Sequence, residues 1–217
     1  MKLVIVNSGV GNVRSVANML KRLGVECLIS DRPKEVEQAG AIIVPGVGSY
    51  DAAIRRFRET GLRDALDAKA RGGTTPMIGI CLGMQLMGDY SEEGDEPGFG
   101  WIGGSVKRFD PASGGEKRLR VPHMGWNLVK PEDGSLFAGL DQPPRYYFDH
   151  SYYFTPTDAA HYGARTTYGV EFASGIRKGL LFGVQFHPEK SHRFGFQLFS
   201  NFVALAKAHV AALEVQL

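Results

Sequence analysis

One stretch decides the fold: Pro76-Met77-Ile78-Gly79-Ile80-Cys81-Leu82-Gly83-Met84-Gln85-Leu86. It opens with an apolar run after Pro76 that is short enough for a buried strand. It then reads Gly-x-Cys-x-Gly, and an apolar segment compatible with a helix follows. Gly-x-nucleophile-x-Gly between a strand and a helix is the nucleophile-elbow pattern, here with cysteine in place of serine. Residues 76–86 therefore predict a strand, an elbow that carries Cys81, and a helix.

The spacing of this elbow has a steric reason. An elbow holds its nucleophile in a strained backbone conformation, and glycines on either side let neighbouring chain approach closely. A helix that starts there points its N-terminal amides at the sulfur, which favours the thiolate over the thiol. Free cysteine is otherwise most often a small core residue. The pentapeptide alone therefore leaves a catalytic and a structural Cys81 both open.

A second stretch favours the catalytic interpretation. Residues 180–186 form another apolar, strand-like run, which ends at His187-Pro188-Glu189. A thiol nucleophile needs a base, and the base needs an orienting group. Glu189 lies two residues beyond His187, so in extended chain both side chains point to the same side. We therefore predict a Cys81–His187–Glu189 triad that only tertiary folding can assemble, although His187 by itself could also be a histidine of a surface loop.

Length and composition narrow the class of protein. A chain of 217 residues, 43% of them hydrophobic, predicts a single α/β domain over residues 1–217 with a sizeable core. The formal net charge of +2 is too small to indicate nucleic acid or an acidic membrane. Two cysteines, Cys27 and Cys81, provide no disulfide framework and suit a reducing, cytoplasmic location. No apolar run suggests a membrane span, residues 1–9 read as a first strand, and no histidine spacing indicates a metal site.

The order of predicted elements indicates the fold class. Buried strands are expected at 3–6, 25–29 (with Cys27 in the core) and 41–44. Helical spacing follows the first strand, and residues 52–70 predict a helix broken near Gly61. This alternation predicts parallel βαβ units with catalytic groups at the carboxyl ends of the strands. Short strands are then expected between 101 and 167, at 101–102, 105–109, 146–148 and 152–154, before a helix from about 194. The prediction is a mainly parallel central sheet flanked by helices, with an antiparallel extension in the second half.

The motifs of both stretches resemble a known family. Residues 79–85 and Phe186-His187-Pro188-Glu189 are similar to the class I (triad) glutamine amidotransferases, whose fold is flavodoxin-like. Four longer motifs are similar to the glutaminase subunits of imidazole glycerol phosphate synthases, from histidine biosynthesis. They are Val44-Pro45-Gly46-Val47-Gly48, Val121-Pro122-His123-Met124-Gly125-Trp126-Asn127, His150-Ser151-Tyr152-Tyr153 and Gln185-Phe186-His187-Pro188-Glu189-Lys190-Ser191. The resemblance covers almost the whole chain.

The resemblance implies an activity, a substrate and a partner. The activity is hydrolysis of glutamine to glutamate and ammonia, without a cofactor or metal. The amides of Val47 and Leu82 would form the oxyanion site, although residues 45–51 by themselves also suit a plain strand-to-helix turn. The residues that would hold glutamine are Gly48, Gln85, Glu93, Ser151 and Tyr152. A (β/α)8-barrel cyclase subunit would form a heterodimer with this chain, and the residues that would face it are Asn12, Trp126 and Lys190.

Two departures from the family pattern leave the glutaminase assignment intact but leave the partner contacts and the exact paralogue open. Asn7-Ser8 stand where the family more usually carries Asp-Tyr, and Asp149 stands where an apolar or small residue is expected. One alternative is a paralogous subunit that supplies ammonia to another synthase, such as one that amidates sugars for surface polysaccharides. Others are a non-catalytic relative, which the intact triad disfavours, and a cysteine hydrolase or peptidase. Gln85, Glu93 and the turn at Ser151 favour free glutamine over a peptide.

Overall fold

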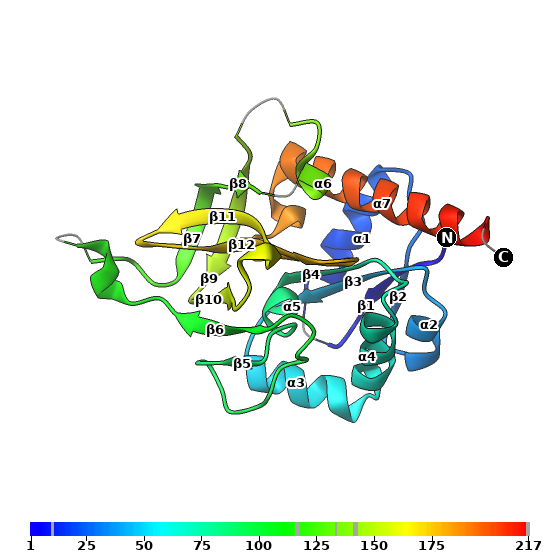
Figure 1. The fold of residues 1–217 in the computed structure, drawn as a ribbon, viewed down its shortest axis with the longest axis horizontal. Helices are drawn as coiled ribbons and strands as arrows, with labels where there is room; N and C mark the ends of the chain where they lie inside the picture. Colours follow the sequence, from blue (N-terminus) through cyan, green and yellow to red (C-terminus); the bar gives the residue numbers. More distant parts are fainter. Residues whose placement is uncertain (10, 116–117, 133, 141–142, 216–217) are drawn as a thin grey trace.

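The computed structural model of the chain describes residues 1–9, 11–115, 118–132, 134–140 and 143–215. A central sheet has the strand order β2-β1-β3-β4-β13-β12-β11-β8 (Figure 1). The first five strands of that order run parallel, and the last three are antiparallel to their neighbours. The predicted class, a parallel sheet with an antiparallel extension, is confirmed. A three-stranded sheet, β10-β6-β5, and a two-stranded ribbon, β7-β9, lie beside it.

The elements have the following bounds. The strands are β1 (Leu3–Val6), β2 (Leu28–Ser30), β3 (Ala41–Gly46), β4 (Met77–Cys81), β5 (Tyr90–Ser91), β6 (Gly104–Arg108), β7 (His123–Leu128), β8 (Lys130–Pro131), β9 (Arg145–His150), β10 (Tyr152–Pro156), β11 (Tyr162–Tyr168), β12 (Val170–Lys178) and β13 (Leu181–Val184). The α-helices are α1 (Val13–Arg22), α2 (Pro33–Glu37), α3 (Tyr50–Glu59), α4 (Leu62–Gly72), α5 (Leu82–Gln85), α6 (Gly134–Phe137) and α7 (His192–Glu214). The 3-10 turns are η1 (Pro111–Gly114), η2 (Ala159–His161) and η3 (Pro188–Lys190).

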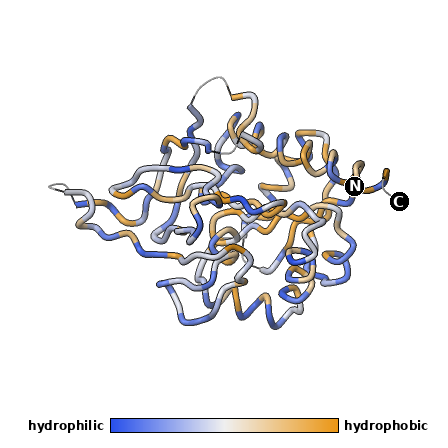
Figure 2. Tube along the Cα trace, in the orientation of Figure 1, coloured by the Kyte–Doolittle hydropathy of each residue, from blue (hydrophilic) through white to orange (hydrophobic). Residues whose placement is uncertain are grey.

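The core has two halves, one on each face of the central sheet. Along β1, Leu3 and Ile5 pack with α1 and α7, whereas Val4 and Val6 pack with α3 and α4. This is the period of two of a strand buried on both faces. Figure 1 shows α1, α6 and α7 on one side of the sheet and α2, α3 and α4 on the other, and Figure 2 shows the hydrophobic residues concentrated along the central strands.

Three parallel strands end at the same edge of the sheet. Gly46 at the end of β3 is in register with Cys81 at the end of β4, and Val184 at the end of β13 is in register with Ile80. The chain continues from β13 through Gln185 into the segment that carries His187. The carboxyl ends of neighbouring parallel strands thus bring residues from three distant parts of the sequence together.

Three predicted elements differ from the structure. The second strand is β2, which starts three residues later than expected because this edge strand pairs only over Leu28–Ser30. Cys27 therefore precedes the strand and is half-buried against the core. Residues 101–102 form a bend, since the amides of Trp101 and Ile102 both donate to the carbonyl of Met87. The helix after Cys81, α5, is a single turn.

The helix α7 corrects a further expectation. It is 23 residues long and, by length and composition alone, apolar enough to cross a membrane, contrary to the expectation from the sequence. Leu198, Phe199 and Phe202 of this helix are buried in the core beside β13, where Phe202 meets Phe182 edge to face. Packing against the sheet accounts for the apolar residues on that face of the helix.

Candidate active site

The backbone at Cys81 has the strained form of a nucleophile elbow. Its φ of 54° and ψ of −111° lie in a region that residues other than glycine rarely adopt. A Cβ on Gly79 would lie 2.5 Å from the carbonyl oxygen of Gly83, and a Cβ on Gly83 would collide with the carbonyl oxygen of Val44. Both glycines are therefore required by close backbone approach, as the spacing predicts. The single turn of α5 gives little support to the argument from a helix dipole.

His187 and Glu189 lie in contact. Nδ1 of His187 is 2.8 Å from Oε1 of Glu189, and both side chains are almost fully buried. The route of the chain differs from the extended segment expected from the sequence, because Pro188–Lys190 forms the 3-10 turn η3. With Nδ1 directed at Glu189, the other ring nitrogen of His187 is left to interact with Cys81.

The surroundings of His187 favour its charged form. Burial by itself would lower the pKa of the imidazole, but hydrogen bonds to Cys81 and Glu189, together with the charges of both, raise the pKa to about 10. An imidazolium beside the sulfur suits a thiolate and supplies a proton for a leaving group. The second oxygen of Glu189, Oε2, is buried and has no hydrogen-bond partner among the described residues.

A cavity of about 330 Å³ opens in front of Cys81. Its lining comprises Val47, Gly48, Cys81, Leu82, Gln85, Glu93, Pro122, Asp149, His150, Ser151, Tyr152 and His187. Every residue predicted to contact glutamine or its oxyanion lies in this lining. Another cavity, of about 340 Å³ between Arg71, Trp101 and Lys178, has neither cysteine nor histidine in its lining.

Gln85 is held by two hydrogen bonds. Its Nε2 donates to the carbonyl oxygen of Tyr152 at 2.9 Å and to Oε1 of Gln185 at 3.0 Å. Its Oε1 has no hydrogen-bond partner among the described residues, and the side chain lines the cavity. This acceptor is therefore available to a donor in the cavity. Sequence reasoning missed Gln185, which gave no signal beyond its place next to Phe186 and His187.

Glu93 contributes a carboxyl group to the same cavity. Burial raises its pKa, the backbone amide of Tyr50 donates a hydrogen bond that lowers it, and the charge of Asp51 raises it. A half-buried carboxylate next to another acidic residue gains most from a cation. Glu93 together with Oε1 of Gln85 thus suits an ammonium group.

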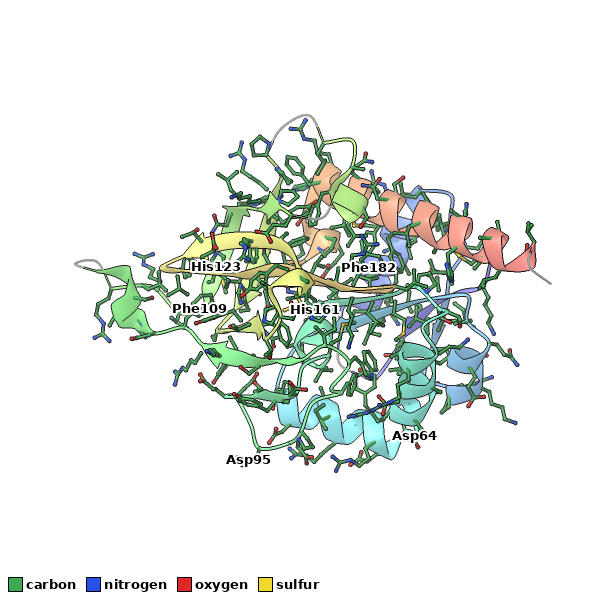
Figure 3. The ribbon with its side chains drawn as sticks, in the orientation of Figure 1. Asp64, Asp95, Phe109, His123, His161 and Phe182 are labelled. Atoms are coloured by element: carbon green, nitrogen blue, oxygen red, sulfur yellow. The ribbon has the colours of Figure 1, made fainter. Side chains whose placement is uncertain are left out.

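Two buried histidines support the turn at Ser151. Nδ1 of His150 donates to the carbonyl of Tyr152 at 2.7 Å, and Nε2 of His150 is 3.1 Å from Nδ1 of His123. Burial lowers the pKa of His123 to about 4 and of His150 to about 3, so both rings are neutral near pH 7. Figure 3 labels His123 and Phe109 in the part of the molecule built from the antiparallel strands, where the two rings meet edge to face.

Two of the three residues expected at a partner surface surround Tyr147. Trp126 is 47% exposed, its ring meets that of Tyr147 edge to face, and its other neighbour is the stacked ring of His192. Lys190 lies over the ring of Tyr147 and 3.8 Å from a carboxylate oxygen of Asp149. Asp149, unexpected in the sequence, thus pairs with a residue of the predicted surface. Asn12 lies just before α1, which contacts η3.

Two further features bear on the chemistry. Cys27 is half-buried, and burial raises the pKa of its thiol.

In the part of the chain that the structure describes, no group of three or more His, Cys, Asp or Glu side chains is arranged to hold a metal ion.

Solved structures share the fold at low sequence identity. A structure titled glutamine amidotransferase is 23% identical, with a TM-score of 0.73 over 94% of this chain and 98% of that one. The structure titled PurLQS from Thermotoga maritima is 19% identical, with a TM-score of 0.69 over 94% of this chain and 98% of that one.

Proteins compared by sequence are more similar to this chain than these solved structures are. A subunit named HisH 2 of the imidazole glycerol phosphate synthase of Pseudomonas aeruginosa is 44% identical over 94% of this chain and 99% of its own. A subunit named HisH from Bdellovibrio bacteriovorus is 42% identical over 91% of this chain and 97% of its own. The family model described as glutamine amidotransferase class-I matches residues 4–205. The chain belongs to the class-I glutamine amidotransferase family.

Proposed function

We propose that this chain is the glutaminase subunit of an imidazole glycerol phosphate synthase. One observation carries the proposal: a single cavity is lined by the candidate nucleophile Cys81, the base His187, and two groups, Gln85 and Glu93, that suit an ammonium. Similarity over nearly the full length to subunits that bear this name supports it. Because histidine biosynthesis is a cytoplasmic pathway, we infer a cytoplasmic location for the protein.

The first half of the reaction forms a thioester. The Cys81 thiolate attacks the side-chain carbonyl carbon of glutamine, and the carbonyl oxygen becomes an oxyanion. Val47 and Leu82 line the cavity, and their backbone amides donate to this oxygen. His187 donates its proton to the departing nitrogen, which leaves as ammonia. Glu189 holds the imidazole ring in place and stabilises its charge, as the acid of a triad does.

The second half releases glutamate. His187, now neutral, takes a proton from a water molecule that attacks the thioester carbon. Collapse of the second oxyanion breaks the carbon–sulfur bond, and the thiolate is regenerated. Glutamine and water are the only reactants consumed, and glutamate and ammonia are the only products. At the other end of the substrate, Gln85 and Glu93 hold the α-amino group, while Gly48 and the turn at Ser151-Tyr152 hold the α-carboxylate.

The ammonia needs an acceptor. A (β/α)8-barrel cyclase subunit that docks against Asn12, Trp126 and Lys190 would receive it and would form imidazole glycerol phosphate and an aminoimidazole carboxamide nucleotide. The cluster of Trp126 and Lys190 around the ring of Tyr147 supports this docking surface, because an exposed aromatic beside a cation is typical of an interface.

The test is steady-state kinetics on the complex with the barrel cyclase encoded in the same genome. With partner and acceptor nucleotide, the chain should release glutamate and the complex should form imidazole glycerol phosphate. Cys81→Ala should abolish glutamine-dependent synthesis and leave synthesis from ammonium salts intact. Loss of both activities in an assembled complex would refute separate sites.

A paralogous role remains as a second candidate, since Asp149 pairs with Lys190 at the predicted surface. In that case a synthase that amidates a sugar would bind the chain and stimulate it, and the barrel cyclase would do neither. Pull-down from the native host, followed by the same glutamate assay with each captured synthase, separates the two candidates.

A further inference from the structure

Gln185 lies behind the nucleophile. Its side chain is completely buried at the end of β13, and its backbone amide donates to the carbonyl of Ser174 at 3.0 Å. One end of its side-chain amide is 3.0 Å from Gln85, and the other is 3.7 Å from the sulfur of Cys81. Gln185 thus touches both the candidate nucleophile and a residue predicted to hold the substrate, although it does not line the cavity.

The direction of these hydrogen bonds follows from a fixed acceptor. The carbonyl oxygen of Tyr152 can only accept, so the side-chain atom of Gln85 that lies 2.9 Å from it is the nitrogen. The second proton on that nitrogen points at Gln185, which must present its oxygen. The nitrogen of Gln185 therefore faces the sulfur of Cys81 as a donor. The amide orientations are determined by the network and need no separate assumption.

A second side chain donates to the same carbonyl. His150 donates to it through Nδ1 at 2.7 Å, so Nε2 of His150 is an acceptor, and Nδ1 of His123 donates to that nitrogen at 3.1 Å. Asn127 in turn donates to Nε2 of His123 at 3.2 Å. Every link from Asn127 to Tyr152 has one donor and one acceptor. The anchor that orients Gln85 and Gln185 is thus itself fixed by buried groups.

Building on the proposed glutaminase activity, we propose that Gln185 is a positioning residue that orients the Cys81 sulfur and holds the amide oxygen of Gln85 toward the substrate. A hydrogen bond from Gln185 to the sulfur is stronger when the sulfur is charged, so it stabilises the thiolate before attack. The side-chain oxygen of Gln185 accepts a hydrogen bond from the Gln85 amide nitrogen. The Gln85 oxygen is thereby left to accept from the substrate ammonium. One buried amide thus acts both on the nucleophile and on a residue that holds the substrate.

The test is the pH dependence of Cys81 alkylation by iodoacetamide, measured in a Cys27→Ser background. This reagent needs neither glutamine nor a partner. Gln185→Met keeps the size of the side chain and removes both hydrogen bonds. We expect the pH midpoint of alkylation to rise by about one unit, which is the lower end of what a hydrogen bond to a charged group contributes.

Gln197→Met is the matched control. Gln197 donates one hydrogen bond, to Asn201 on α7, and does not line the cavity. We expect its alkylation midpoint to equal that of the parent protein. An unchanged midpoint in folded Gln185→Met would overturn the proposal, even if that variant hydrolysed glutamine slowly.

A second variant guards against misfolding of the first. Gln185→Glu keeps the oxygen that accepts from Gln85 and places an oxygen where the donor to sulfur was. Gln185→Glu should raise the pH midpoint of Cys81 alkylation. In a separate protein that also carries Cys81→Ala, the same substitution should change the dissociation constant for glutamine less than threefold. A normal midpoint in this variant would also overturn the proposal. Failure of the parent chain to hydrolyse glutamine with any synthase would instead refute the proposed function, since alkylation reports on Cys81 alone.

Discussion

The backbone amide of His187 donates to the carbonyl oxygen of Tyr147 at 2.8 Å, in an isolated antiparallel bridge. This bond ties the candidate base to β9, the strand that pairs with the Trp126 strand, β7. Ser191 reinforces it, since its hydroxyl accepts from the amide of Tyr147 at 3.0 Å and donates to the carbonyl of His187 at 2.6 Å. The candidate partner surface and the base are therefore joined by three short hydrogen bonds.

Ser191→Ala should separate the base from this ribbon. Ser191 is fully buried, so the variant leaves the Tyr147 amide without its side-chain acceptor and His187 with one donor fewer. We expect the free energy of unfolding to fall by about 2 kcal/mol. We also expect kcat for glutamine to fall several-fold with little change in KM, because Ser191 does not line the cavity.

Chemical denaturation and steady-state kinetics measure both effects. Ser113→Ala is the control: its hydroxyl also donates to a backbone carbonyl, that of Asp110, but at an exposed turn. It should change neither quantity appreciably. A wild-type kcat in Ser191→Ala would show that the base needs no support from β9.

A diazo-ketone analogue of glutamine should label Cys81 and spare Cys27. Cys81 faces the cavity, and its interaction with His187 raises the pKa of that imidazole, whereas burial raises the pKa of the Cys27 thiol and leaves less thiolate. Peptide mass spectrometry after a short exposure identifies the site. Free glutamine should protect it, and Cys27→Ser should be labelled at the parent rate. Label found chiefly on Cys27 would mean that the nucleophile is wrongly assigned.

The elbow was predictable from sequence because its pattern is short. Gly79 is required by a backbone contact inside the strand–turn–helix unit, and Gly83 by the backbone of the neighbouring strand β3, so both requirements appear as glycines at fixed spacing around Cys81. The pairing of His187 with Glu189 was likewise predictable from two residues close in sequence. Its geometry was not, because the turn η3 depends on how Ser191 and Tyr147 hold the segment.

Contacts between distant residues gave no sequence signal. Gln185 lies 104 residues from Cys81 and 100 from Gln85, and its place behind the nucleophile follows from the pairing of β13 with β4. The start of β2 was misjudged for a similar reason. Residues 25–29 have the composition of a buried strand, but only three residues pair at this edge of the sheet. Tertiary context, and not the intrinsic preference of the residues, determines both the position of Gln185 and the start of β2.

The buried histidines should make the protein sensitive to mild acid. The pKa of His123 is lowered to about 4 and that of His150 to about 3, whereas both are near 6.5 in the unfolded chain. Between these values the unfolded state binds more protons, so stability is fully present above pH 6.5 and falls as the pH drops. His187, whose pKa is raised to about 10, has the opposite dependence: its contribution is present below pH 6.5 and is lost as the pH rises through about 10.

We expect the free energy of unfolding to fall by a few kcal/mol between pH 6.5 and 4.5. His123→Phe retains a ring that can stack on Phe148 and Tyr168 and removes one of the two titrating groups. Its stability should be lower at pH 7 and less dependent on pH below 6.5. Urea denaturation at half-unit steps of pH measures both, and parallel pH profiles for the two proteins would contradict this assignment.

Gly48 should control the oxyanion site. Its φ of +98° disfavours any residue with a side chain, yet no atom lies within 4 Å of a Cβ built there. Gly24 has the same properties, with a φ of +71° and an equally open surrounding, but it does not line the cavity. Gly48→Ala and Gly24→Ala therefore introduce comparable backbone strain, of about 1–2 kcal/mol each, and differ in their distance from the chemistry.

The expected difference between these variants is in turnover. The Val47 amide belongs to the peptide between Gly46 and Val47, and rotation of that peptide toward or away from the oxyanion requires the backbone of the adjoining Gly48 to adjust. One missing donor lowers kcat by roughly a hundred- to thousandfold. We expect the isolated chain to be a poor glutaminase that partner and nucleotide stimulate on that scale. Gly48→Ala should lose most of this stimulation, whereas Gly24→Ala should keep it and show only a lower melting temperature. Steady-state glutaminase kinetics on each chain alone, with the cyclase, and with cyclase plus nucleotide give the ratio of stimulated to unstimulated kcat. Full stimulation in Gly48→Ala, or full activity of the isolated parent chain, would exclude gating by this peptide and would leave the proposed triad unaffected.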